Sequence, residues 1–232
     1  MNASWISVKN AKGEQFDAYL SLPPLGRGPG LVLIQEIFGV NEHIRAVADQ
    51  YAADGYCVLA PDVFWRDAPR VELGYDPAGF ERGMTLLGKL NIERAALDLK
   101  GAVTTLRGHA ACTGTVGSLG FCMGGLLSYI AAAEAGVDTA VCYYGGGIHN
   151  QLDRTKKINC PVLFHFADQD AYIPGTAVDA IKAAMAGRSN ARIIVHPGVD
   201  HGFNCWRRPA WNQVTAARAR GQSLVHLSET LR

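Results

Sequence analysis

Residues 117–125 read Gly-Ser-Leu-Gly-Phe-Cys-Met-Gly-Gly, and this stretch predicts the fold of the whole chain. It has the pattern G-x-C-x-G, with Cys122 at its centre and a glycine two residues to either side. An apolar, β-prone run, 113–116, precedes it, and a helical run rich in small residues, 126–135, follows it. This is the strand-turn-helix context of a nucleophile elbow, whose glycines let strand and helix approach closely. The alternative interpretation is a buried structural cysteine in a glycine-rich turn.

Short apolar runs alternate with helical stretches along most of the chain. The runs that predict strands are 30–34, 56–60, 113–118, 139–144, 162–166 and 192–196, and the helical stretches are 42–54, 91–108, 123–136, 175–187 and 209–231. This alternation predicts an α/β fold with a mostly parallel sheet and helices on both faces. Segments 4–9 and 16–22 predict an N-terminal antiparallel hairpin. We expect residues 1–232 to form a single domain, with 66–83 as a long excursion over the surface or over the site.

The composition is that of a globular protein acting on small molecules. Of the 232 residues, 48% are hydrophobic and 19% are charged, and the formal net charge is +1, so there is no electrostatic footprint for nucleic acid or an anionic membrane. The N-terminal residues lack the pattern of a signal peptide, and no apolar run approaches the roughly 18 residues that span a bilayer. We expect a cytoplasmic protein that is a monomer or a small homo-oligomer.

The cysteines are dispersed and form no C-x-x-C pair. This spacing argues against a zinc site and against a disulfide framework, so no metal is predicted and the thiols are expected to be reduced. Cys57 and Cys142 lie inside apolar runs and are expected to be core residues. The six cysteines are Cys57, Cys112, Cys122, Cys142, Cys160 and Cys205.

Three polar residues at predicted strand ends have the types and the order of a catalytic triad. The ligand site of a parallel sheet lies beyond the carboxyl ends of its strands. Cys122, Asp170 and His201 follow such ends, and nucleophile, acid and histidine occur in the chain order of the α/β-hydrolases. A thiol needs a base to become a thiolate, and a carboxylate orients the imidazole that serves as the base. Asp168 is the alternative for the acid.

The loop after the strand predicted at 30–34 carries two further candidates. Glu36 would cost several kcal/mol if buried unpaired, so it either serves the site or is a solvated loop acid. The backbone amide of Ile37 is a predicted oxyanion donor, together with the amide of Met123, which directly follows the nucleophile.

Over essentially its whole length the sequence resembles the dienelactone hydrolases, also called carboxymethylenebutenolidases. The resemblance implies a single-domain α/β-hydrolase without a cofactor that opens an activated enol-lactone bearing a carboxylate, as in catechol breakdown. It also implies that Cys122 is the nucleophile, His201 the base and acid, and Asp170 its orienting partner. The segments that carry the resemblance are Gln35-Glu36-Ile37-Phe38-Gly39, Ala60-Pro61-Asp62, Gly120-Phe121-Cys122-Met123-Gly124-Gly125, Tyr143-Tyr144-Gly145, Asp168-Gln169-Asp170 and His201-Gly202-Phe203.

The family pattern assigns two further roles. Glu36 would hold the resting thiol neutral until substrate binds. Arg82 is similar to the family's first carboxylate-binding arginine, although a solvated arginine on a helix face is the alternative. The second such arginine is expected a few residues after the catalytic histidine, where this chain has Asn204-Cys205-Trp206, with Arg207 and Arg208 just beyond.

These residues predict a hydrolase of lactones or related esters, with or without a carboxylate, that works through a thioester on Cys122. The alternatives are a carboxylesterase of broader specificity and a non-catalytic relative that binds a ligand without turnover. Aromatic side chains could line an apolar substrate pocket or belong to the core, namely Phe38, Trp65, Tyr144, Phe203 and Trp206.

Overall fold

One eight-stranded sheet, in the order β1-β2-β4-β3-β5-β6-β7-β8, forms the centre of the protein. The computed structural model describes residues 2–231, so Met1 and Arg232 of the expected domain lie outside the described part. β1 pairs antiparallel with β2 and β2 with β4, while the other neighbours are parallel, which confirms the predicted sheet and hairpin. The strands are β1 Asn2–Lys9, β2 Gln15–Leu22, β3 Gly28–Ile34, β4 Cys57–Pro61, β5 Cys112–Phe121, β6 Thr139–Tyr143, β7 Val162–Ala167 and β8 Ala191–His196.

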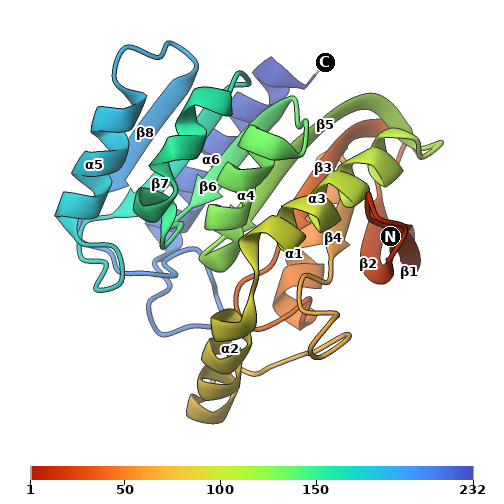
Figure 1. The fold of residues 1–232 in the computed structure, drawn as a ribbon, viewed down its shortest axis with the longest axis horizontal. Helices are drawn as coiled ribbons and strands as arrows, with labels where there is room; N and C mark the ends of the chain where they lie inside the picture. Colours follow the sequence, from red (N-terminus) through yellow and green to blue (C-terminus); the bar gives the residue numbers. More distant parts are fainter. Residues whose placement is uncertain (1, 232) are drawn as a thin grey trace.

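Helices cover both faces of this sheet, as predicted. Figure 1 shows α3, α4 and α5 in front of the sheet and α6 behind it. α1 lies with α6, because Arg220 of α6 pairs with Asp54 at the end of α1 and stacks over the ring of Tyr51. Within residues 2–231, no helix is both long and apolar enough to cross a membrane. The helices are α1 Glu42–Ala53, α2 Pro77–Lys89, α3 Ile92–Arg107, α4 Met123–Glu134, α5 Gly175–Met185 and α6 Gln213–Thr230, with short 3-10 helices at Ile148–Asn150 and Leu152–Lys157.

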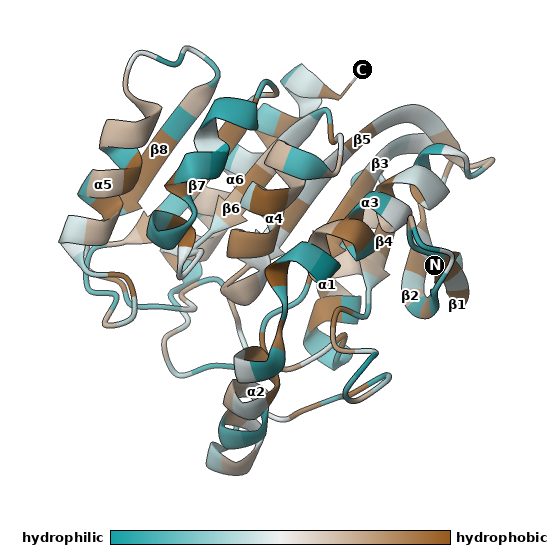
Figure 2. Ribbon diagram, in the orientation of Figure 1, coloured by the Kyte–Doolittle hydropathy of each residue, from teal (hydrophilic) through white to brown (hydrophobic). Residues whose placement is uncertain are grey.

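The core lies between the sheet and its two helical layers. Strands buried on both faces need continuous apolar sequence, and β4 and β6, for example, are buried at every residue. Cys57 and Cys142 are core residues of these two strands, as expected. The central helix α4 is buried along nearly its whole length and is brown over much of it in Figure 2. This helix begins directly after Cys122, so the core holds the elbow from both sides.

The predicted excursion at 66–83 runs into a helix that the sequence analysis did not predict, α2. Three glycines weaken its helix propensity, which explains why no helical pattern was recognised there. Asp76 caps its N-terminus by accepting a hydrogen bond from the third helical amide, and Pro77 occupies the first helical position. α2 projects away from the sheet at the lower edge of Figure 1. The candidate site lies between α2 and the carboxyl ends of the parallel strands.

Candidate active site

The elbow holds Cys122 in a backbone conformation that side chains rarely adopt, with φ 57° and ψ −118°. The conformation persists because strand β5 and helix α4 are packed against each other at this point. A Cβ at Gly120 would overlap the backbone of Gly124, and a Cβ at Gly124 would overlap the carbonyl oxygen of Ile34. The glycines of the motif are therefore required by close backbone approach. The thiol itself is half-buried, at the carboxyl end of the sheet.

The structure brings His201 and Asp170 to this edge and joins them. Nδ1 of His201 lies 2.7 Å from Oδ2 of Asp170, and both residues are buried. The other carboxylate oxygen of Asp170 accepts the backbone amides of Tyr172 and Ile173, at 2.8 and 3.1 Å, which fixes its orientation. Asp168, the alternative acid, is exposed and accepts a backbone amide in a turn. The pairing with the histidine thus belongs to Asp170.

The pKa of His201 reflects an interaction with the Cys122 thiol. Burial by itself lowers the pKa of His201, but the charge of Cys122 and the hydrogen bonds with Asp170 and Cys122 outweigh burial and raise this pKa to about 10. A raised imidazole pKa is what an adjacent thiolate and a buried carboxylate produce together. The three side chains therefore form one interacting unit that can exchange a proton between sulfur and nitrogen.

Glu36 is fully buried, which excludes the solvated loop acid that the sequence left open. Its Oε2 accepts a hydrogen bond from the hydroxyl of Tyr75 at 3.2 Å, and its Oε1 is 3.3 Å from a guanidinium nitrogen of Arg208. Arg208 also lies 5.9 Å from the ring centre of Phe38. A Cβ at Gly202 would overlap the Arg208 guanidinium, so the charge packs directly against the residue that follows His201. Glu36 is thus the counter-ion of an arginine at the site.

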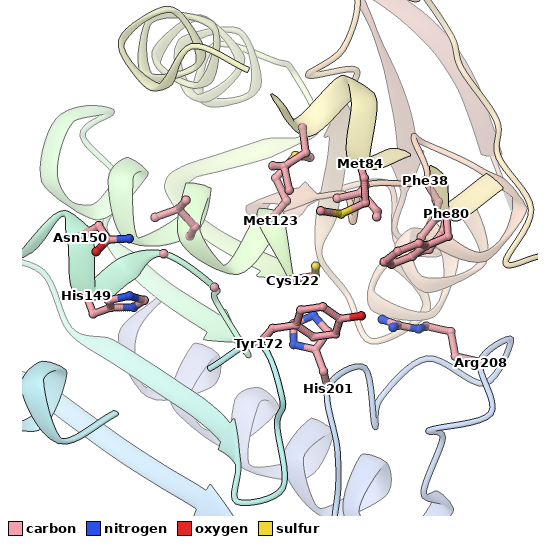
Figure 3. Close-up of a pocket in the computed structure, with 15 residues that line it drawn as sticks. Phe38, Phe80, Met84, Cys122, Met123, His149, Asn150, Tyr172, His201 and Arg208 are labelled. Atoms are coloured by element: carbon pink, nitrogen blue, oxygen red, sulfur yellow. The ribbon is translucent and has the colours of Figure 1, made fainter. Parts of the chain in front are cut away.

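A cavity of about 310 Å³ opens above the triad. In Figure 3, Cys122 and His201 lie in its middle, Arg208 lies at one side near Phe80, and His149 lies at the other. The predicted oxyanion residues Ile37 and Met123 line it, as does Phe38. Most of the lining is apolar, and its members are Ile37, Phe38, Phe80, Met84, Leu87, Cys122, Met123, Leu126, Gly146, Gly147, His149, Asn150, Tyr172, His201 and Arg208.

Four of the predicted substrate-binding residues do not line this cavity. Arg82 is exposed on α2, because the helix turns other residues toward the cavity. Trp65 lies elsewhere, stacked on Phe16 with 5.8 Å between the ring centres. Tyr144 and Phe203 are fully buried beneath the site, where the ring of Tyr144 lies 5.0 Å from that of His201. Trp206, the remaining aromatic candidate, contacts the ring of His43 instead, with 4.2 Å between the ring centres.

The sequence analysis missed most of the residues that shape the cavity. Phe80, Met84 and Leu87 come from α2, and their i, i+4, i+7 spacing is a helical signal that could have identified this face. Arg208 follows His201 in the sequence, but nothing in the loop sequence indicates that its side chain packs against Gly202, next to His201. Tyr172 follows Asp170 closely and could have been found by its position after the strand end.

The chain is similar to known proteins over most of its length. The family model described as "Dienelactone hydrolase family" matches residues 16–230. A carboxymethylenebutenolidase of Pseudomonas putida is 32% identical over 215 residues, covering 92% of this chain and 90% of the relative. Another, from a Pseudomonas species, is 33% identical over 192 residues, covering 82% of this chain and 80% of the relative.

Solved structures show the same fold. A structure from Klebsiella pneumoniae, whose name also refers to dienelactone hydrolase, is 27% identical and has a TM-score of 0.84, covering 97% of this chain and 98% of the other. A dienelactone hydrolase-like promiscuous phosphotriesterase from metagenomic libraries has a TM-score of 0.83 at 18% identity, with full coverage of both chains, and shows the fold alone. The chain belongs to the dienelactone hydrolase family and is a carboxylic ester hydrolase with an α/β-hydrolase fold.

Proposed function

We propose that this protein opens activated lactones that carry a carboxylate, using Cys122 as a nucleophile and a thioester intermediate. The observation that carries the proposal is the arrangement of three groups around one apolar cavity. Cys122 stands on the elbow, His201 interacts with it and is held by Asp170, and Arg208 supplies a positive charge within the same cavity. The names of the curated relatives, which are carboxymethylenebutenolidases, support the same substrate class.

The proposed chemistry has two halves. The Cys122 thiolate attacks the lactone carbonyl, and the backbone amides of Ile37 and Met123 stabilise the oxyanion. Collapse of this intermediate breaks the ring C–O bond, and protonated His201 supplies the proton that the enolate oxygen takes up. In the second half, neutral His201 takes a proton from water as the water attacks the thioester. The thiolate then leaves, and the open-chain acid is released.

Arg208 and Glu36 connect substrate charge to this chemistry. A substrate carboxylate that binds Arg208 competes with Glu36 for the same guanidinium. Glu36 is then free to turn toward the elbow thiol and assist its ionisation. A carboxylated substrate would in this way prepare the nucleophile as it binds, since the carboxylate that it releases from Arg208 can accept the proton of the thiol.

A broader carboxylesterase is the second candidate, and the apolar lining of the cavity is the observation that favours it. Phe80, Met84 and Leu87 give no reason to reject a neutral ester of similar shape. We further propose a cytoplasmic location and a role in the breakdown of aromatic compounds. The six unpaired cysteines are consistent with a reducing compartment.

The test compares lactones with and without a carboxylate in matched arginine variants. Arg208→Met should raise KM for the carboxylated lactone by about 10- to 150-fold, since a charge-assisted hydrogen bond is worth ~1.5–3 kcal/mol. Neutral lactones should change much less. Arg207→Met is the matched control, because Arg207 pairs with Glu42 and is half exposed outside the cavity.

Steady-state kinetics with both substrates decide the outcome. Equal losses on charged and neutral lactones in Arg208→Met would exclude a carboxylate clamp at this position. A loss of activity on the carboxylated lactone alone, seen in Arg82→Ala but not in Arg208→Met, would identify Arg82 as the residue that binds the substrate carboxylate. If no lactone is turned over faster than a simple carboxylic ester, the broader esterase is the better description.

A further inference from the structure

Three buried side chains with metal-binding atoms meet beside the triad. The carboxylate of Glu36, the imidazole of His43 and the thiol of Cys205 place one donor atom each within 4.8 Å of one another. Their residues are only 0%, 3% and 1% exposed. They come from the loop after β3, the first turn of α1 and the loop after His201, so only the fold brings them together. Their wide separation in the sequence gives no short metal-binding motif.

His43 is the member that points to a ligand. Neither of its ring nitrogens has a hydrogen-bond partner among the described residues, although both are buried. A buried polar atom without a partner is costly, and such atoms in a native protein call for an explanation. Burial also lowers the pKa of His43, so the ring is neutral and its nitrogen lone pair is available. Neutral imidazole is the form that binds metal ions.

Cys205 supplies the second kind of donor. Burial and the nearby Glu36 carboxylate raise the pKa of Cys205 to about 12, so the thiol is protonated in the metal-free protein. A coordinating metal ion displaces that proton outright. Thiolate and carboxylate together then carry two negative charges, which balance a divalent cation. The hydroxyl of Tyr75 already contacts Glu36 and would hold its second oxygen in place.

We propose that Glu36, His43 and Cys205 form a Zn²⁺ site. One sulfur, one imidazole nitrogen and one carboxylate oxygen are a ligand set that Zn²⁺ accepts, with donors about 2.0–2.3 Å from the metal and a fourth position open for water. The donors need only small side-chain rotations to close around an ion, since they already lie within 4.8 Å. The site is distinct from the Cys122 triad and does not depend on the proposed hydrolysis.

A surface depression offers a path from solvent to this site. It has a volume of about 600 Å³, and His43 and Tyr75 form part of its wall. Three carboxylates, those of Glu42, Glu72 and Asp76, also line it, against the single arginine Arg207. This surplus of negative charge favours the approach of a cation. The catalytic cavity, by contrast, presents the positive charge of Arg208.

The proposed site shares Glu36 with Arg208. The guanidinium lies 3.3 Å from the same carboxylate that would bind the metal, so metal and arginine compete for it. Removing the arginine charge in Arg208→Met should therefore strengthen metal binding. Metal binding at residues far from Arg208 would not respond to this substitution.

The experiment measures metal binding to the full chain in a Cys122→Ser background, which removes the half-buried elbow thiol as a competing ligand. Zn²⁺ is measured by equilibrium dialysis, and Co²⁺ is used as a spectroscopic probe. We expect one equivalent of metal and a sulfur-to-cobalt charge-transfer band. Cys205→Ser and His43→Gln should each weaken binding by more than the about 10- to 100-fold that loss of an outer-shell partner costs. Cys160→Ser, which alters a half-buried thiol elsewhere, is the matched control and should bind normally.

Two results would overturn the proposal. One is a charge-transfer band that survives in Cys205→Ser, and the other is tight binding that disappears only when Cys122 is replaced. Circular dichroism checks that each variant is folded. A readout that needs no variant at this site is the alkylation of Cys205 followed by peptide mass. Zn²⁺ should slow this reaction in the folded Cys122→Ser protein, and an unchanged rate would also contradict the site.

Discussion

At the scale of single residues, the carboxylate of Glu36 has the greatest influence on the proposed chemistry of the site. It is completely buried, and its two oxygens are held by Tyr75 and Arg208. In the proposed mechanism, this carboxylate acts on the elbow thiol only after Arg208 has bound another anion. The proposed chemistry therefore depends on whether Glu36 is paired with Arg208.

Replacing Glu36 by glutamine tests this dependence. In the wild-type protein, a carboxylated substrate analogue that leaves the thiol accessible should accelerate alkylation of Cys122 by iodoacetamide, because it draws Arg208 away from Glu36. Glu36→Gln should lose this acceleration together with much of kcat, while Glu42→Gln, an exposed carboxylate outside the cavity, should keep both. The measurement is the alkylation rate read from the mass of the Cys122 peptide. Rapid alkylation of Cys122 in the wild-type protein without any analogue would show that Glu36 does not control the reactivity of this thiol.

The residues that sequence reasoning located share one property. Cys122, Asp170 and His201 each follow a strand end, and a parallel sheet brings such ends to one edge whatever the details of packing. Arg208 could not be located in this way, since a loop sequence does not indicate where its side chains return. The family pattern indicates Arg82 by its position in the sequence, which does not specify the face of the helix on which it lies. In the structure Arg82 lies on the exposed face of α2.

At the scale of elements, α2 closes the cavity and touches the loop after β3, which carries the proposed oxyanion donor Ile37. Gly83 of α2 lies so close that a Cβ there would come within 2.7 Å of the carbonyl oxygen of Ile37. The sequence gives only a weak signal for this helix, because its three glycines lower the helix propensity. One of them, Gly83, is needed for the close contact with Ile37. The β-strands were predicted within a few residues of their ends, and the apolar runs of inner strands such as β4 and β6 follow from burial on both faces.

Gly83→Ala should reduce kcat/KM by about tenfold or more without unfolding the protein, because shifting the Ile37 backbone by even part of an ångström misplaces an oxyanion donor. Gly88→Ala is the matched control on the same helix, since a Cβ there meets nothing within 4 Å. It should leave the rate unchanged and stabilise the fold by up to ~1 kcal/mol. Kinetics and thermal unfolding of both variants make the comparison. Equal activity in the two would show that α2 does not position the oxyanion loop.

At the scale of the whole molecule, the triad joins the ends of β5, β7 and β8, so its ionisation contributes to the stability of the fold. The folded pKa of His201, about 10, lies above the unfolded value of about 6.5. The protonated ring therefore stabilises the folded state. This contribution is complete below about pH 6.5 and is lost as the pH rises toward about 10.

The free energy of unfolding should show this loss. The difference between wild type and His201→Gln should shrink between about pH 6.5 and about pH 10, by at most ~1.4 kcal/mol for each pH unit. Denaturant unfolding at several pH values provides the measurement. Because the Cys122 charge helps to raise this pKa, Cys122→Ser should narrow the pH range over which stability is lost. A difference that stays constant with pH would mean that His201 is not held by these two partners.

The central claim is that acyl transfer passes through the sulfur of Cys122. The most direct test mixes the protein with a slowly hydrolysed activated ester, quenches the reaction early and reads peptide masses. We expect the acyl mass on the peptide that contains Cys122, its removal by hydroxylamine as for a thioester, and neither adduct nor turnover in folded Cys122→Ala. Wild-type turnover by Cys122→Ala, or an adduct confined to another residue, would contradict the account.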